Sequence, residues 1–430
     1  MAKLVVELGP QRKGTLSPLH EPGPAYSVPA GRIHMFSSRT SWDRAPNPLA
    51  MALREASSAG RPIHDLTESN PTRCELVDLA PAIRALGDPR GALYQPAPLG
   101  HDVARRAVAS YYAAKAISVE PGRVMLSAST SESYAWLFGL LADPGDAVLV
   151  PRPSYPLLSF IAASQNVALV PYRLAREAGF RVDFADLRQQ IGPRTRAIVV
   201  VHPNNPTGNF VRQDEAEQLV ELAARHDLAL VVDEVFADHV LGPLPLGAVP
   251  SFAGTRGALT FVMSGLSKVA LLPQCKLGWT VVTGPQALVA EALARLELVA
   301  DTFLSVATPV QLALADLLAS RGAAAAAVRS RSLHNLAALD LTLSELGPSS
   351  PLRRLPVEGG WYAILEVPSI HDEDTWTEIL VQEDGIVVHP GYFFDFDRDG
   401  FLVVSLLPPA AAFREAIRLL VQRIAGECTR

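Results

Sequence analysis

Between residues 123 and 263 the chain alternates short apolar segments with segments of helical periodicity, and this alternation constrains the fold more than any other feature. Strands that are apolar on both faces are typical of parallel sheets buried between layers of helices. Intervening segments such as ESYAWLFGLLA (132–142) have the length and apolar spacing of helices. The sequence therefore predicts an α/β fold with a mostly parallel sheet and helices on both faces. The predicted strands are RVMLS (123–127), DAVLV (146–150), VALVPY (167–172), RAIVVV (196–201), LALVVD (228–233) and LTFVM (259–263).

The chain changes character toward its C-terminus. Ala- and Leu-rich segments predict long helices over about residues 286–346. Beyond them, three strand-type segments and a closing helix over 412–426 predict a second, smaller α+β domain. The acidic segment His371–Trp376 indicates a solvated turn or a helix start rather than a metal site. Residues 1–31 contain five prolines and predict an extended arm or a disordered leader.

Composition excludes several classes of protein. The chain has 430 residues, with 38 Lys and Arg against 44 Asp and Glu, a net charge of -6. Without a basic face, nucleic acid is not an expected partner. Three cysteines without metal or redox spacing favour a reducing compartment. We find no apolar run of membrane-spanning length and no apolar core of a signal peptide, and we expect a cytoplasmic protein of two to three domain-sized units.

Lys268 lies in SGLSK (264–268), between the apolar segment LTFVM and the apolar residues that follow it. A surface lysine in a loop is the ordinary interpretation. A lysine that points into an apolar pocket has a lowered pKa instead, which makes its amine a usable nucleophile. The rest of the sequence decides between the two.

Polar residues follow two of the predicted strands. HPNNPTG (202–208) comes after RAIVVV, and Asp233 closes LALVVD. The carboxyl ends of parallel strands are where α/β sheets bind ligands, although Asn-Pro and Thr-Gly are also ordinary turn pairs. Asp233 suits a helix N-cap, or a carboxylate that holds a proton on a ring nitrogen.

The segment ASTSES (128–133) joins a predicted strand to a predicted helix. Small hydroxyl residues at a helix N-terminus can bind phosphate, because free backbone amides and the helix dipole point toward it. Ordinary capping by Ser or Thr is the alternative.

In their order along the chain, which is ASTSES, PRPSYP with Tyr155, the Asn turn, Asp233 and then Lys268, these segments resemble the pyridoxal-phosphate enzymes of fold type I, specifically the class I/II aminotransferases. The resemblance covers roughly residues 32–430 and is carried by NNPTG, DEVF and SGLSK, and further by YQPAPLG, PGDAVLVPRPSYP, EGGWYAILEVP and HPGYFF. It implies a seven-stranded type of sheet in a large cofactor domain (73–309). It also implies a small α+β domain built from residues 32–72 and 310–430.

The resemblance implies roles for four residues around the cofactor ring. Lys268 would form the Schiff base with the aldehyde of pyridoxal 5'-phosphate and then shuttle the substrate's α-proton. Asp233 would keep the pyridine nitrogen protonated, so that the ring acts as an electron sink. Asn205 would bond the phenolic oxygen, and Tyr155 would stack on the ring.

The resemblance also implies how phosphate and substrate are held. Thr130 and Ser131, with their backbone amides, would bind the phosphate. Tyr94 would reach the phosphate of a neighbouring subunit, which implies a homodimer with shared active sites. Asn70, in ESNPT, belongs to a turn that borders the substrate in relatives.

Three positions depart from the family pattern. Lys276 stands where relatives usually have an arginine that binds the phosphate, so the charge remains but the bidentate fork is lost. Phe236 stands where a tyrosine often bonds the phenolic oxygen. Val403 stands where relatives that act on α-amino acids have an arginine for the substrate carboxylate, and no arginine lies between Gly400 and Phe413. Arg39 is a candidate replacement, although a surface role suits it equally.

The sequence thus predicts an aminotransferase that moves an amino group from an amino acid or amine to a carbonyl acceptor by a ping-pong mechanism. A lyase, decarboxylase or oxidase with the same cofactor is the first alternative, and Val403 favours it. A ligand-sensing regulator is the second, but the 31-residue arm is too short for an added DNA-binding module.

Overall fold

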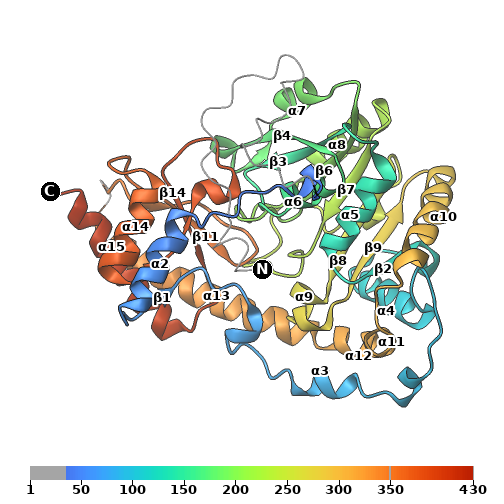
Figure 1. Cartoon of the computed structure of the whole chain (residues 1–430), viewed down its shortest axis with the longest axis horizontal. Helices are drawn as coiled ribbons and strands as arrows, with labels where there is room; N and C mark the ends of the chain where they lie inside the picture. The colour runs from blue at the N-terminus through green and yellow to red at the C-terminus, as the bar shows by residue number, and fades with distance from the viewer. Residues whose placement is uncertain (1–34, 348–349, 430) are drawn as a thin grey trace.

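A computed structural model describes residues 35–347 and 350–429 of the chain (Figure 1). The Pro-rich arm predicted for residues 1–31 lies outside the described residues.

The large sheet has eight strands, and its five central neighbours β8, β7, β6, β3 and β4 are parallel. The prediction of a mostly parallel sheet is confirmed. Strands β2, β9 and β5 join antiparallel at the edges. In sheet order the strands are β2 (Val124–Ser127), β9 (Gly278–Thr283), β8 (Thr260–Gly265), β7 (Ala229–Asp233), β6 (Thr195–Val201), β3 (Ala147–Arg152), β4 (Ala168–Ala175) and β5 (Arg181–Val182).

Helices cover both faces of this sheet, which explains why its strands are apolar throughout (Figure 1). Successive residues of β7 point to opposite faces, so Leu230 and Val232 pack in one core while Val231 packs in the other. The helices around the sheet are α4 (Asp102–Ala113), α5 (Thr130–Leu141), α6 (Leu158–Ser164), α7 (Phe184–Gln190), α8 (Gln213–Arg225) and α10 (Gln286–Phe303).

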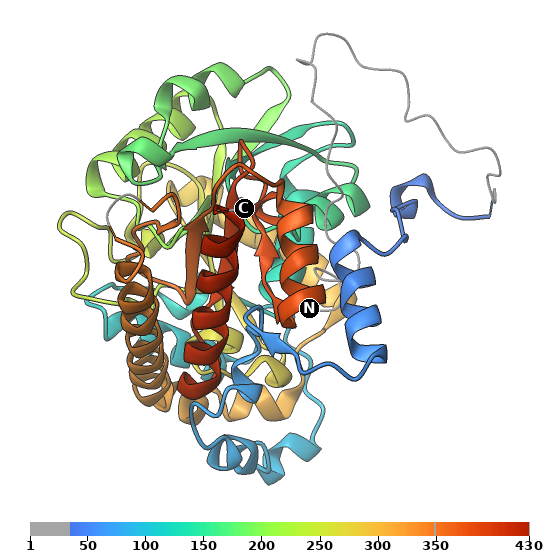
Figure 2. The ribbon, with the colours of Figure 1, turned by 90° about the vertical axis from the view of Figure 1, so that its left-hand side faces the viewer.

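The smaller part is built on an antiparallel sheet with helices on its outer face (Figure 2). Its strands are β10 (Arg353–Arg354), β11 (Tyr362–Glu366), β14 (Phe401–Ser405) and β13 (His389–Pro390), and a separate pair is formed by β1 (His64–Asp65) and β12 (Ile386–Val387). The helices are α2 (Pro48–Ser58), α14 (Glu373–Asp384) and α15 (Ala410–Glu427). Segments from both ends of the described chain therefore meet here, while the domain limits given above stay a prediction.

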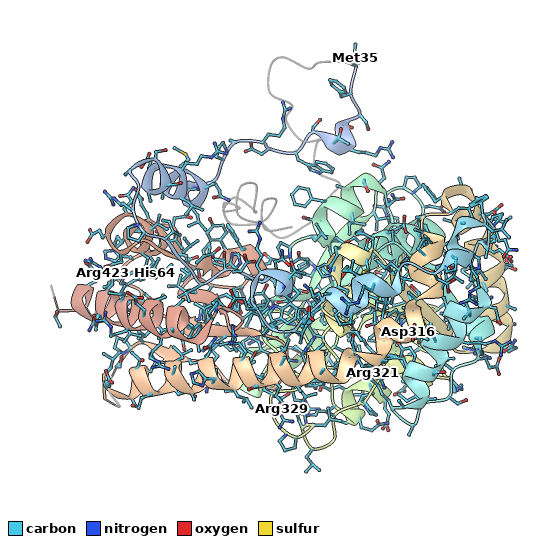
Figure 3. The ribbon with its side chains drawn as sticks, turned by 90° about the horizontal axis from the view of Figure 1, so that it is seen from below. Met35, His64, Asp316, Arg321, Arg329 and Arg423 are labelled. Atoms are coloured by element: carbon cyan, nitrogen blue, oxygen red, sulfur yellow. The ribbon has the colours of Figure 1, made fainter. Side chains whose placement is uncertain are left out.

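The acidic segment 371–376 begins a helix: the Asp372 side chain accepts a hydrogen bond from the Thr375 amide and caps α14. The long helix α13 (Arg321–Ser344) runs between the two parts, with Arg321 and Arg329 marking its course in Figure 3. The remaining short helices are α3 (Ala80–Ala85), α9 (Leu266–Val269), α11 (Thr308–Leu312) and α12 (Leu314–Ala319). Within the described ranges, each helix is too short or too polar to cross a membrane.

Candidate active site

Lys268 lies in the short helix α9, directly after the central strand β8. Its Nζ atom is 4.7 Å from the ring centroid of Trp361 and 5.6 Å from that of Phe236. The ring of His239, which also packs against Trp361, forms a hydrogen bond of 2.9 Å with the backbone oxygen of Lys268 and holds the helix in place. Burial lowers the pKa of the Lys268 amine to about 8, and the negative charge of Asp233 opposes that shift. The amine is therefore far more nucleophilic near neutral pH than a surface lysine.

Asp233 ends β7, the strand next to β8. The hydroxyl of Tyr134, from α5, donates to its Oδ2 atom at 3.2 Å, and the Val235 amide donates to Oδ1 at 3.1 Å. Burial raises the pKa of the carboxyl to about 6, while these two donors and the charge of Lys268 act in the opposite direction. The carboxylate is thus held in place by two bonds and is still ionised at neutral pH.

Asn205 lies in the turn that follows β6 and is 8% exposed. Its Oδ1 atom has no hydrogen-bond partner in the described part of the chain. The neighbouring Asn204 donates to the Pro153 carbonyl at 3.0 Å, which ties this turn to the segment carrying Tyr155. Burial raises the pKa of the Tyr155 hydroxyl, and the electrostatic influence of Tyr362 and Asp233 raises it further. The Tyr155 side chain is therefore close enough to Asp233 to be affected by its charge.

The N-terminus of α5 presents free amides. Ser129 caps the helix by accepting from the Glu132 amide at 3.2 Å, and this leaves the first helical residues, Thr130 and Ser131, with amides that have no partner inside the helix. A Cβ atom on Gly278 of β9 would lie 3.2 Å from the Thr130 nitrogen, so a side chain there would crowd the cap. Lys276, two residues earlier, is exposed and adopts a left-handed backbone conformation with φ 47°.

These groups fit the pyridoxal phosphate that the sequence leads us to expect. A nucleophilic lysine, a bonded carboxylate and an unpartnered buried amide meet at one edge of the sheet, at the carboxyl ends of β6, β7 and β8. The free helix N-terminus on α5 would suit a phosphate. Lys268, Asp233 and Tyr155 are each only partly buried, which leaves surface on them for a ligand to contact.

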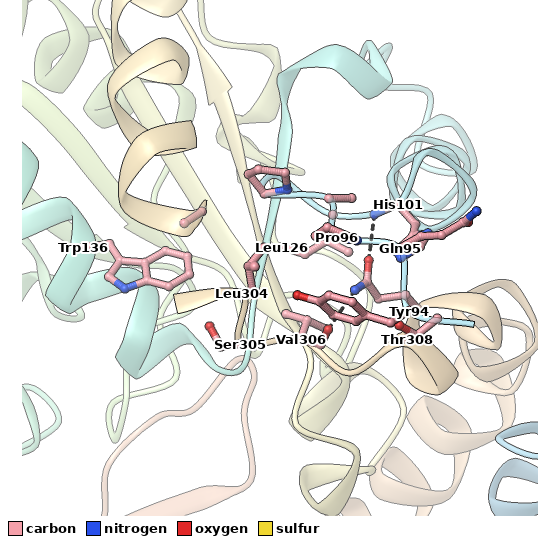
Figure 4. A pocket seen from close by; sticks show the side chains of 15 residues that line it. Tyr94, Gln95, Pro96, His101, Leu126, Trp136, Leu304, Ser305, Val306 and Thr308 are labelled. Carbon is pink, nitrogen blue, oxygen red and sulfur yellow. Dashed lines mark hydrogen bonds between the residues drawn. The ribbon is translucent and has the colours of Figure 1, made fainter. Parts of the chain in front are cut away.

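Three other residues that the sequence analysis named have their described contacts with other parts of the chain. Tyr94 is 70% exposed and lines a recess beside α10 and α11 (Figure 4). That recess has a volume of about 30 Å³, too small for a cofactor. Asn70 accepts from the amide of Thr72 at 3.1 Å and caps a short turn. Arg39 is exposed and donates to the Ser164 carbonyl at 3.2 Å.

The sequence analysis did not identify Tyr134, His239, Trp361 and Tyr362 as site residues. Trp361 packs edge-on against Phe236 with ring centroids 4.8 Å apart. Burial raises the pKa of Tyr362, whereas Ser69 and Trp361 lower it, so Ser69 of ESNPT lies beside this pair. The sequence motif EGGWYAILEVP, which contains Trp361 and Tyr362, could have indicated them. It supported the family resemblance but assigned no role to these two residues.

The glycines of two motifs bring these segments together. A Cβ atom on Gly208, at the end of NNPTG, would lie 2.4 Å from the backbone oxygen of Gly359, in EGGW. Gly359 itself approaches the His239 backbone oxygen, which its Cβ would meet at 2.9 Å. Only residues without side chains permit this approach. It places Trp361 over Lys268.

Comparison with known proteins identifies a family. A model of the aminotransferase class I and II family matches residues 62–420. The chain is 29% identical over 328 residues to alanine aminotransferase of Mycobacterium tuberculosis, covering 74% of this chain and 75% of that protein. It is 29% identical over 214 residues to nicotianamine aminotransferase 1 of Oryza sativa subsp. japonica, covering 50% of this chain and only 42% of that relative.

Solved structures show the same fold. Alanine aminotransferase from Pyrococcus furiosus superimposes with a TM-score of 0.79 at 22% identity, covering 88% of this chain and 96% of its own. A Thermus thermophilus aspartate aminotransferase mutant superimposes with a TM-score of 0.75 at 24% identity. Within the residues that the structure describes, no cluster of His, Cys, Asp and Glu could hold a metal ion.

Proposed function

The chain belongs to the class I and II aminotransferase family, and from that premise we propose that it uses pyridoxal 5'-phosphate to move an amino group from an amino acid or amine to a carbonyl acceptor by a ping-pong mechanism. We expect the protein to work in the cytoplasm. The observation that carries the proposal is the placement of a partly buried amine, Lys268, and the carboxylate of Asp233 at the carboxyl ends of two neighbouring strands, where each influences the pKa of the other.

When bound, the cofactor supplies a carbonyl that captures the amino group and a ring that accepts electrons from the substrate. Lys268 is the proposed nucleophile, since burial lowers the pKa of its amine to about 8. The same amine is proposed to move the proton of the substrate's α-carbon. Trp361 and Phe236 lie beside the Nζ atom, and the lowered pKa makes a larger fraction of the amine neutral near pH 7 than in an exposed lysine.

Asp233 is proposed to hold a proton on the cofactor's ring nitrogen. This role needs an ionised carboxylate in a buried place, and the Tyr134 hydroxyl and the Val235 amide favour the ionised form. Asn205 is proposed to donate a hydrogen bond from its side-chain NH2 group to the phenolic oxygen, and Tyr155 to cover the ring face.

Phosphate binding is proposed for the N-terminus of α5. Thr130 and Ser131 would donate from their amides and hydroxyls, and Lys276 would add positive charge. Tyr94 is 70% exposed, and we propose that it reaches the phosphate held by a second copy in a homodimer.

The proposal is tested by spectroscopy of the full chain loaded with pyridoxal phosphate. A panel of amines and amino acids is added in the absence of any acceptor. Conversion of the cofactor to pyridoxamine phosphate by at least one donor, followed by return to the aldehyde form on adding a keto acid, is expected. A panel in which every donor leaves the cofactor unchanged contradicts transamination.

Val403 supports one other candidate function, a lyase, decarboxylase or oxidase that acts on an amino compound without an arginine-bound carboxylate. Product analysis separates the two. Transamination leaves an equivalent of pyridoxamine phosphate for each carbonyl product, whereas the alternative chemistries return the aldehyde form of the cofactor without an acceptor.

A further inference from the structure

The inner face of the small sheet carries an unusual set of side chains. Val403 of β14 pairs with Ile364 of β11 on one side and with His389 of β13 on the other. Residues directly opposite each other in antiparallel strands project from the same face. The three side chains therefore form one row, and all are buried, with exposures of 0%, 2% and 5%.

The row belongs to the hydrophobic core that also contains the site helix α9. Val403 and Ile364 are part of the same core as Leu266 and Val269, the first and last residues of that helix. Alternate residues of the strands, such as Val404 and Ala363, pack instead in the core under α14 and α15.

Phe394 links the row to the proposed cofactor environment. Its backbone oxygen accepts from the Ser154 amide at 2.9 Å, one residue before Tyr155. Its ring centroid is 5.8 Å from that of His389 and 6.1 Å from that of Tyr362. The imidazole of His389 thus lies one ring away from residues beside Tyr155 and Trp361.

The row lacks a cation. Burial lowers the pKa of His389 to about 4, so its imidazole is neutral at physiological pH. Arg152, two residues before Ser154, directs its guanidinium to the backbone oxygens of Asp395 and Phe396 and pairs with the Asp395 carboxylate at 3.4 Å. Arg39 donates to the Ser164 carbonyl at the molecular surface. A carboxylate pressed against this row would receive no charge compensation from these described side chains, and its burial would be costly.

The row does offer neutral hydrogen-bonding groups. The Nδ1 atom of His389 and the Oγ atom of Ser154 are both buried and have no hydrogen-bond partner within the described residues. Their side chains are 5% and 7% exposed. A neutral imidazole can donate from one nitrogen and accept at the other, which suits an uncharged polar group.

We propose that the small-sheet row of Ile364, Val403 and His389 selects amino substrates that carry an uncharged polar group, such as a carboxamide or a hydroxymethyl group, where an α-carboxylate would otherwise lie. His389 is the specificity-determining residue and bonds that group, with Ser154 as a second donor or acceptor. The inference rests on the proposed function, since it assumes that the amino substrate is held between Lys268 and the small sheet.

The test measures binding to the cofactor-free full chain by calorimetry and needs no turnover. The probes are two reduced conjugates, N-(5'-phosphopyridoxyl)alanine and N-(5'-phosphopyridoxyl)alaninamide, which differ only in carboxylate against carboxamide. We expect the amide conjugate to bind at least about 10-fold more tightly. Equal or tighter binding of the carboxylate conjugate overturns the inference while leaving the cofactor site intact. If neither conjugate binds, the proposed function itself fails, because both carry the pyridoxyl phosphate.

Two variants at His389 test its role. His389→Phe removes the hydrogen-bonding nitrogens and is expected to bring the preference for the amide conjugate close to 1-fold. His389→Gln keeps a neutral hydrogen-bonding group and is expected to retain most of the preference. Thermal unfolding of each variant checks that it folds. A preference that is unchanged in a folded His389→Phe protein contradicts the assignment to His389, and the wild-type comparison remains decisive if that variant does not fold.

Discussion

At the scale of single residues, the site depends on a lysine and an aspartate that each have a shifted pKa. Burial lowers the pKa of Lys268 and raises that of Asp233, so each group is moved toward its neutral form. The charge of each group partly opposes the pKa shift that burial causes in the other. Neither residue could show this from sequence alone, because the shifts come from what surrounds them in space.

The pKa of Lys268 can be measured in the cofactor-free protein. We expect the rate of labelling of Lys268 by an amine-acylating reagent, followed by peptide mapping, to rise with pH through an inflection near 8, since the neutral amine is the reactive form. In Asp233→Asn the inflection should move to lower pH, because the removed negative charge favours the ammonium. An inflection near the ordinary lysine value of 10.5 would contradict the burial of the amine.

Tyr134 positions Asp233, and its hydroxyl favours the ionised carboxylate. Tyr134→Phe removes that bond, so the pKa of Asp233 rises above about 6 and less of the carboxylate is ionised near neutral pH. We expect a loss of about 1 kcal/mol, or roughly fivefold in affinity for pyridoxal phosphate. Equilibrium dialysis at pH 6 and pH 8 should find the larger defect at pH 6.

The matched control is Tyr172→Phe, because the buried Tyr172 hydroxyl bonds the Val199 carbonyl at 2.8 Å rather than Asp233. A defect of the same size in both variants, independent of pH, would show that Tyr134 acts through packing alone.

At the scale of elements, sequence patterns predicted the strands that matter most to the site. RAIVVV, LALVVD and LTFVM became β6, β7 and β8, because burial on both faces forces an apolar run. Strand β9 was not predicted, since GWTVVT follows the apolar stretch after Lys268 without a separating helix. Tyr134 and Asp233 are 99 residues apart, and only the packing of α5 on the sheet brings them into contact.

The contact between the NNPTG turn and EGGW should be sensitive to one methyl group. Gly208 has φ 71° and its Cβ would lie 2.4 Å from the Gly359 oxygen. Gly208→Ala therefore combines backbone strain with a clash, and we expect a loss of about 3 kcal/mol in the free energy of unfolding, measured with urea.

Gly179→Ala is the control, since Gly179 has φ 74° and open space around its Cβ position. We expect that variant to lose about 1 kcal/mol from strain alone. If both variants lost the same free energy of unfolding, the close contact between the NNPTG turn and Gly359 would not contribute to stability.

At the scale of the whole molecule, two parts meet around Lys268, and a long helix, α13, runs between them (Figure 1). The sequence predicted both parts from the change in character of the last hundred residues. It could not predict that Trp361 would lie over Lys268, because that contact depends on how the parts are joined.

A second copy of the chain is expected to complete each site. Tyr94 is 70% exposed. Two other large apolar side chains are exposed as well, Leu93 at 62% and Phe303 of α10 at 60%. We expect sedimentation analysis to find a particle of twice 46.1 kDa.

Hybrid dimers give a sharper test of the shared site. Lys268→Ala and Tyr94→Ala chains are co-expressed with different tags, and the hybrid is purified through both. One of its two sites then combines an intact Lys268 with the partner's intact Tyr94. We expect that site to bind pyridoxal phosphate with wild-type affinity, which neither parental homodimer shows at any site. A hybrid with only parental affinities would contradict a site shared between subunits.

Lys268 as the amine that carries the cofactor is the central claim, and reductive trapping tests it most directly. The full chain is incubated with one equivalent of pyridoxal phosphate, reduced with borohydride, digested and mapped by mass spectrometry. We predict a phosphopyridoxyl group on the peptide containing Lys268, and its loss in Lys268→Ala. Cofactor fixed at other lysines, with the Lys268 peptide unmodified, would contradict the assignment.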